Sequence, residues 1–226
     1  MRQPTPFYEC RRVPSGSIRV DGILDDPAWE DILSVGGFVL SDGSGPATRQ
    51  TEARMCWDER YLYVAFGCYD PDIWGTMLNR DDHIWEEEVV EAFIDPDSDL
   101  QGYYEFQTSP RGVMTDLLIH NVSGSNKRMK GDITWNCEGW LVGVQVDGTL
   151  DDRTDVDKGW TVEWAIPFAS IPGAPNTPPK DGDTWRMNFY RIDRTPAPEH
   201  SCWSPTLAVP PDYHIPSRFG TIIFRE

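Results

Sequence analysis

The stretch TEARMCWDERYLYVAFGCY, residues Thr51–Tyr69, decides the fold class of this chain. Its first seven residues place Ala53, Met55 and Trp57 on one face, with Glu52 and an arginine facing the other way. After the polar turn DER, apolar side chains again recur at every second position. Because successive side chains of a strand point to opposite faces of a sheet, this spacing predicts two half-buried strands joined as a hairpin.

The same period of two residues recurs along most of the chain. Further predicted strands are 17–20, 36–40, 88–95, 102–109, 113–120, 140–148, 160–166, 185–192 and 219–224. Short helical turns are expected only at 25–31, where an acidic residue precedes a proline, and at 168–171. Many short strands between Gly, Pro and Asp turns predict an all-β fold. We expect one antiparallel β-sandwich domain, of the jelly-roll or immunoglobulin-like kind, over residues 1–226.

Composition excludes several classes of partner. The net charge is −17, so the surface repels the phosphates of nucleic acids and of anionic lipids. No apolar run reaches the length of a membrane span. Ten Trp, eight Tyr and nine Phe stand in an otherwise polar chain. Most should fill the core between sheets, and a few are expected to form a binding surface. The oligomeric state is left open.

The five cysteines include no CxxC pair, so we expect no zinc site, and their odd number leaves at least one thiol unpaired. The N-terminus MRQPTPFYEC lacks the apolar stretch of a signal peptide. We expect an extracellular or periplasmic protein whose signal is absent from this chain, with a cytoplasmic location as the alternative.

Two long loops, Pro71–Glu87 and Thr195–Ser217, are the expected sites of function, because long loops in compact domains usually bind ligands or are disordered. Each offers an aromatic residue expected to be exposed, Trp85 and Tyr213. Glu91 follows on a strand face below the first loop. An aromatic ring can stack on the apolar face of a sugar while a carboxylate accepts bonds from its hydroxyls. The structural alternative is an internal ion pair of Glu91 with an arginine.

Several segments, in this order along the chain, resemble carbohydrate-binding module family 9, a β-sandwich family related to the DOMON domains. Each segment is short, and together they span nearly the whole chain. They are VDGILDDPAW (20–29), WDERYLYV (57–64), YDPDI (69–73), WEEEVVEAFID (85–95), GYYEF (102–106), TVEWAIPF (161–168) and PSRFG (216–220).

The resemblance implies non-catalytic binding of polysaccharide chain ends or oligosaccharides of glucan or xylan type, alongside glycoside hydrolases. In that family two aromatic side chains clamp the sugar. By its motifs Trp85 is the first aromatic, Glu91 is the strand glutamate that contacts sugar, and Tyr213 is the second aromatic, where the best-known members have Trp. The family's strand arginine falls on Gln107, and Arg111 or Arg191 are the candidates to supply the missing charge.

The resemblance also implies a structural calcium ion, although no other cofactor is expected. Asp95, Asp97 and Asp99 alternate along the chain and offer the oxygen ligands that this cation prefers. A solvated acidic turn is the alternative.

Two other functions stay open. A haem-binding electron-transfer domain of DOMON type would use Met114 and His120 as iron ligands, but six residues of strand separate them by roughly 20 Å. A sugar hydrolase would use a pair of carboxylates, which are plentiful here.

Overall fold

The computed structural model describes residues 4–226, which form thirteen strands and five short 3-10 turns. The strands are β1 (Phe7–Arg12), β2 (Val39–Leu40), β3 (Thr51–Trp57), β4 (Tyr61–Tyr69), β5 (Val89–Asp95), β6 (Gly102–Thr108), β7 (Met114–His120), β8 (Lys130–Asp132), β9 (Leu141–Asp147), β10 (Gly159–Pro167), β11 (Thr184–Asp193), β12 (Glu199–Cys202) and β13 (Gly220–Arg225). The 3-10 turns are η1 (Pro27–Trp29), η2 (Ile84–Glu86), η3 (Asn126–Arg128), η4 (Phe168–Ser170) and η5 (Pro216–Arg218).

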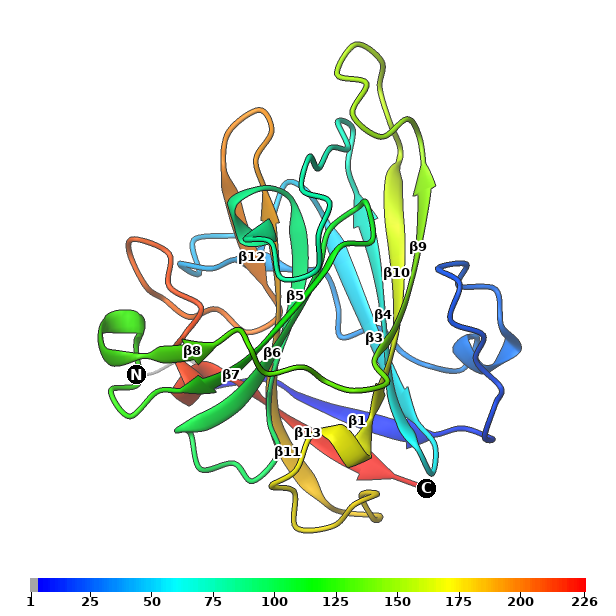
Figure 1. Ribbon diagram of the computed structural model, residues 1–226, viewed down its shortest axis with the longest axis vertical. Coiled ribbons are helices and arrows are strands. Elements are labelled where there is room, and N and C mark those ends of the chain that lie inside the picture. The colour runs from blue at the N-terminus through cyan, green and yellow to red at the C-terminus, as the bar shows by residue number, and fades with distance from the viewer. Residues whose placement is uncertain (1–3) are drawn as a thin grey trace.

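The strands join into one curled sheet in the order β8-β7-β6-β5-β11-β13-β1-β3-β4-β10-β9, with β12 and β2 attached beside β11. Figure 1 shows the green strands β5, β6 and β7 on one side and the cyan to yellow strands β3, β4, β10 and β9 on the other. The expected β-sandwich is thereby confirmed. One feature differs from the antiparallel expectation, since β1 runs parallel to both β13 and β3.

The main core lies between the two halves of this curled sheet. Phe66 of β4 contacts Trp164 of β10 and Phe189 of β11, with ring centroids 5.0 and 5.6 Å apart. A smaller apolar cluster covers the opposite face of β5, β6 and β11, under the loops that follow β4 and β12. That second face carries the candidate site.

The hairpin predicted from residues 51–69 is confirmed as β3 and β4, paired from Thr51 with Cys68 to Trp57 with Leu62. Its turn is fixed by Asp58, whose carboxylate accepts hydrogen bonds from two backbone amides of the turn at 2.7 and 2.8 Å. Such a bond to the chain's own backbone is the usual reason for Asp in a turn.

The predicted strand at 17–20 was wrong, because this segment belongs to a loop tied to β10. The Glu163 carboxylate accepts the backbone amides of Asp21 and Gly22 at 3.0 and 2.9 Å, and the Trp29 indole at 2.8 Å. Gly22 has φ +86°, and a Cβ there would lie 2.6 Å from the backbone of Val144. Only glycine fits this close approach.

All five cysteines are buried free thiols. Within residues 4–226 no helix combines the length and apolar character needed to cross a membrane.

Candidate functional site: an acidic, aromatic-lined pocket

Neighbouring strands bring three acceptor side chains onto one sheet face. Glu91 of β5 pairs with Gln107 of β6, and Phe93 pairs with Glu105. Since Glu91, Phe93, Glu105 and Gln107 all lie at odd positions of paired strands, they point the same way. Each of the four is at most 5% exposed.

These side chains line a pocket of about 340 Å³. This volume falls in the range of about 300–1,000 Å³ typical of small-ligand sites. Its walls come mainly from segments outside the sheet, namely the loop before β5 and the segments around β8 and after β11. Besides the side chains already named, it is lined by Trp85, Leu117, Asn126, Met129, Ile192, Arg194, His200, Pro211, Asp212, Tyr213 and His214.

The two buried carboxyl groups of this pocket, Glu91 and Glu105, have few hydrogen-bond donors to stabilise their charged form. Burial, with Glu105 nearby, raises the pKa of Glu91 well above its usual range. Glu91 accepts no hydrogen bond from the side chains and backbone of residues 4–226. Burial raises the pKa of Glu105 to about 8, and this carboxylate accepts a hydrogen bond from the Gln107 amide. The other amide atom, Gln107 Oε1, is buried without a partner among the described residues. Glu91, Glu105 and Gln107 form the floor of the pocket, and several of their oxygen atoms are free to accept hydrogen bonds.

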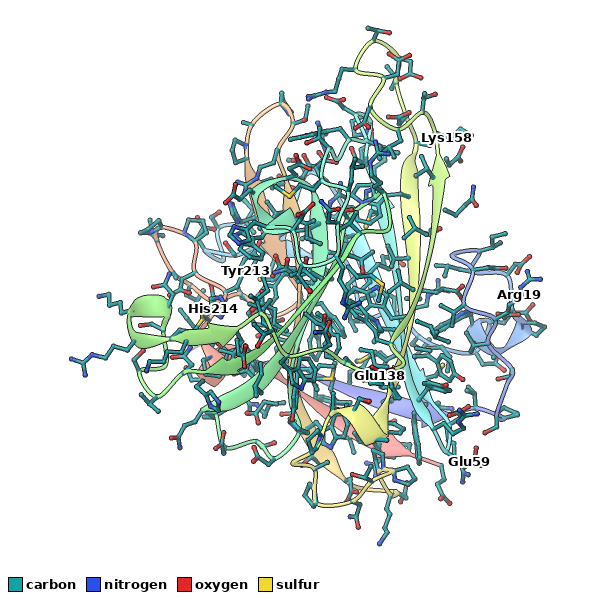
Figure 2. All side chains as sticks on the ribbon, in the orientation of Figure 1. Arg19, Glu59, Glu138, Lys158, Tyr213 and His214 are labelled. Carbon is teal, nitrogen blue, oxygen red and sulfur yellow. The ribbon has the colours of Figure 1, made fainter. Side chains whose placement is uncertain are left out.

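His214 forms a neutral polar wall beside these acceptors. Its Nδ1 lies 2.9 Å from the Tyr103 hydroxyl, and its Nε2 lies 4.0 Å from the Glu105 carboxylate. Burial lowers the pKa of His214 to about 4, so the ring carries no charge at neutral pH. Figure 2 shows Tyr213 and His214 close together in this view.

Trp85 lies at the pocket on η2, as expected for the first loop. It is partly exposed, and the His83 ring stacks against it with centroids 4.4 Å apart. Its backbone carbonyl accepts a hydrogen bond from Arg194 at 2.6 Å. This bond ties the loop before β5 to the end of β11.

Tyr213 also lines the pocket, but it is buried, and the expectation of an exposed ring was wrong. It is 8% exposed, stacked on Tyr190 with centroids 4.1 Å apart. Its hydroxyl donates to the Arg191 carbonyl at 2.9 Å. One ring face and the polar tip of Tyr213 are therefore already occupied within the protein.

The two arginines predicted to supply a positive charge, Arg111 and Arg191, are not among the residues that line this pocket. Arg111 donates to the Gly75 carbonyl at 2.7 Å and forms an ion pair with Asp151. Arg191 is fully buried on the opposite sheet face, in ion pairs with Asp70 and Asp193 at 2.8 and 2.9 Å. The structure therefore does not pair Glu91 with either arginine.

Arg194, Glu105 and His214 were not among the predicted site residues. The alternation of side chains along the strands indicated the positions of Arg194 and Glu105. On β11, Tyr190 and Ile192 face the pocket side, so Arg194 continues that face and Arg191 does not. Glu105 likewise shares a face with Gln107. His214 had no such clue, because its position depends on how the loop after β12 folds.

The predicted metal ligands Asp95, Asp97 and Asp99 do come together at the end of β5. Each offers an oxygen atom, and these atoms lie within 4.8 Å of one another. Asp95 is 0% exposed, and its Oδ1 has no partner among the described residues. Burial raises the pKa of Asp95 to about 7, with the neighbouring Asp97 adding to the effect. An unpartnered buried carboxylate oxygen beside two further carboxylates fits a hard cation.

The candidate haem ligands Met114 and His120 occupy the two ends of β7, opposite Thr108 and Gly102 of β6. A haem iron needs its axial ligands on opposite sides of one atom, and this strand keeps the two side chains apart.

Taken together, a curled β-sandwich with an acidic, aromatic-lined pocket on one outer face defines a small-ligand binding module. The family model for carbohydrate-binding family 9 matches residues 44–224. The chain belongs to this family.

Similar sequences occur both within much larger enzymes and in a protein of similar size. The endo-1,4-β-xylanase A of Thermotoga maritima is 34% identical over 164 residues, which are 72% of this chain but 13% of the xylanase. An extracellular protein of Arthroderma benhamiae is 28% identical over 186 residues, covering 77% of this chain and 78% of that protein. The chain thus spans a small part of the xylanase and most of the extracellular protein.

Solved structures share the fold at low sequence identity. A putative carbohydrate-binding protein from Bacteroides uniformis has a TM-score of 0.76 at 19% identity, covering 98% of this chain and all of that one. A family 9 module from Caldicellulosiruptor kristjanssonii in complex with cellotriose has a TM-score of 0.64 at 15% identity, covering 97% of this chain and 93% of that one.

Proposed function

We propose that this protein is a non-catalytic module that binds carbohydrate, of the chain-end or oligosaccharide type found in glucans and xylans, in the pocket beneath Trp85. The observation that carries the proposal is the set of free acceptors on the pocket floor, Glu91, Glu105 and the Gln107 carbonyl, next to a partly exposed indole. Sugar hydroxyls supply the donors that these groups lack.

The pocket has the two kinds of surface that a sugar ring requires. Trp85 and Met129 give apolar area against which C–H groups can lie. Carboxylate acceptors make hydrogen bonds about twice as strong as neutral ones, and they orient the ring. The relatives support this ligand class, since similar folds have been solved with cellotriose and with glucose.

A titration screen tests the proposal. Glucose, cellobiose and xylo-oligosaccharides should quench tryptophan fluorescence and give saturable heat in calorimetry. Incubation with the same polysaccharides should release no new reducing ends. Absence of binding to every glucan and xylan fragment would contradict the proposal, and production of reducing ends would favour the hydrolase alternative.

We further propose that Asp95, Asp97 and Asp99 hold a structural calcium ion. The support is the unpartnered Asp95 oxygen, which a cation bound there would satisfy. Such an ion would stiffen the β5–β6 turn at the far end of the strand that carries Glu91. It takes no part in ligand binding.

For location, we propose that the module works outside the cytoplasm. The support is the similarity to a protein named as extracellular.

A further inference from the structure

The balance of acidic and basic side chains in the pocket bears on which sugar it prefers. Its acidic side chains are Glu91, Glu105 and Asp212, against one cation, Arg194. That guanidinium donates to the Trp85 carbonyl, so part of its hydrogen-bonding capacity serves the loop. The two histidines that line the pocket, His200 and His214, both have a lowered pKa because of burial and are neutral. The pocket therefore has more acidic side chains than cationic ones.

A neutral sugar satisfies this pocket only in part. Its hydroxyl groups donate one hydrogen bond each and bring no charge, so nothing would favour ionisation of both buried carboxyl groups at once. An ammonium group donates three hydrogen bonds and carries the opposite charge. It would let Glu91 and Glu105 ionise together, and it would lie within reach of the unpartnered Gln107 Oε1.

The whole molecule favours the same kind of ligand. The net charge is −17, which concentrates cations near the surface and repels anionic glycans. Gln107, which pairs with Glu91 across the two strands, is neutral and brings no positive charge to the pocket. Among the described lining residues, Arg194 is the one cation.

We infer that the pocket selects a sugar bearing a free amino group, such as a 2-amino-2-deoxyglucose unit, with its ammonium group between Glu91 and Glu105. This inference rests on the proposed carbohydrate binding and names the class of sugar. N-acetylation removes both the charge and two of the donors, so acetylated sugars should lose the preference.

Calorimetric titration near neutral pH tests the inference, with glucosamine and its β-1,4-linked disaccharide compared with glucose, cellobiose and N-acetylglucosamine. We expect the amino sugars to bind at least about tenfold more tightly than the neutral ones, as for charge-assisted bonds in a buried site. Equal or weaker binding of the amino sugars would overturn the inference and leave the proposed function standing. Failure of every sugar to bind would instead overturn the proposed function.

Paired variants separate the pocket from the general acidity of the surface. Glu91→Gln and Glu105→Gln keep the size of each side chain and remove its charge, so each should reduce the ratio of amino-sugar affinity to glucose affinity to less than about threefold, even where glucose affinity itself falls. The matched control is Glu138→Gln, an exposed residue that Figure 2 shows away from Tyr213 and His214 in that view. It should keep the full preference. A preference that survives both pocket substitutions, or that disappears equally in Glu138→Gln, would overturn the inference.

Discussion

Tyr213 and Tyr190 stack with centroids 4.1 Å apart and planes 17° apart, and each ring is fixed by its own hydroxyl. The Tyr190 hydroxyl donates to the Tyr213 carbonyl at 3.0 Å, while the Tyr213 hydroxyl donates to the Arg191 carbonyl at 2.9 Å. The loop after β12 is thereby attached to the face of β11. Tyr213 is part of the pocket wall, whereas Trp85 on the opposite loop keeps exposed area for a ligand.

This packing predicts that a larger ring at position 213 is harmful. Tyr213→Trp should cost about 1–3 kcal/mol of folding free energy through overpacking, and it should not raise sugar affinity. Thermal unfolding and calorimetric titration of the same sample measure both effects. Tyr69→Trp is the matched control, since Tyr69 is 52% exposed. A gain in affinity without loss of stability in Tyr213→Trp would show that the ring is available to ligand after all.

Trp85→Ala should weaken binding of cellobiose by about thirtyfold, equivalent to about 2 kcal/mol for a lost aromatic contact. Fluorescence of the remaining tryptophans and calorimetry follow the change. Leu78→Ala in the same loop is the control, because Leu78 is 69% exposed and does not line the pocket. If Trp85→Ala bound cellobiose as tightly as the unmodified protein, the indole would have no role in the site.

Stability without ligand should fall as the pH rises from about 4.5 to about 8, the interval over which the raised pKa of Glu105 acts. The folded state holds a proton that the unfolded chain has already released in this interval, so the penalty is complete above the folded-state pKa and absent below the unfolded one. Burial raises the pKa of Glu88 to about 9, which acts in the same direction. Each unit of pKa corresponds to about 1.4 kcal/mol.

Glu105→Gln should flatten part of this pH profile. Thermal melts of the variant and the unmodified protein across the interval give the comparison. The contribution of Glu88 should remain in both. Identical profiles would mean that Glu105 titrates normally and that the pocket floor is better solvated than its burial indicates.

Calcium should raise the unfolding midpoint if Asp95, Asp97 and Asp99 hold the ion. At a hundredfold excess over its dissociation constant, a ligand adds about 2.7 kcal/mol to stability. Asp95→Asn should remove the calcium effect, whereas Asp25→Asn, at an exposed aspartate near the N-terminus, should keep it. Melts with calcium and with a chelator measure the difference. A midpoint that ignores calcium would support the solvated-turn alternative.

The sequence was informative where structure is local. The alternation in residues 51–69 predicted β3 and β4 with their observed ends, because a hairpin depends on neighbouring residues alone. β1 was missed because its partners, β13 and β3, lie far along the chain and run parallel to it. β12 was missed because it lies within a proline-rich loop.

The site divides in the same way. Glu91 and Gln107 could be placed on one face from their strand positions, and the structure brings them together with Trp85 and Tyr213. Arg191 was predicted to supply the positive charge because of its residue type alone. The alternation of side chains along β11 favoured Arg194 instead. The burial of Tyr213 could not be foreseen, since it depends on the contact with Tyr190 that only the folded loop creates.

A crystal structure with cellobiose or its diamino counterpart bound would show whether the pocket beneath Trp85 is the sugar site. We expect a sugar ring against Trp85, with polar groups within hydrogen-bond distance of Glu91 and Glu105. A sugar bound elsewhere would contradict it, for instance in the neighbouring hollow of about 400 Å³ that shares His200 and Pro211 with this pocket.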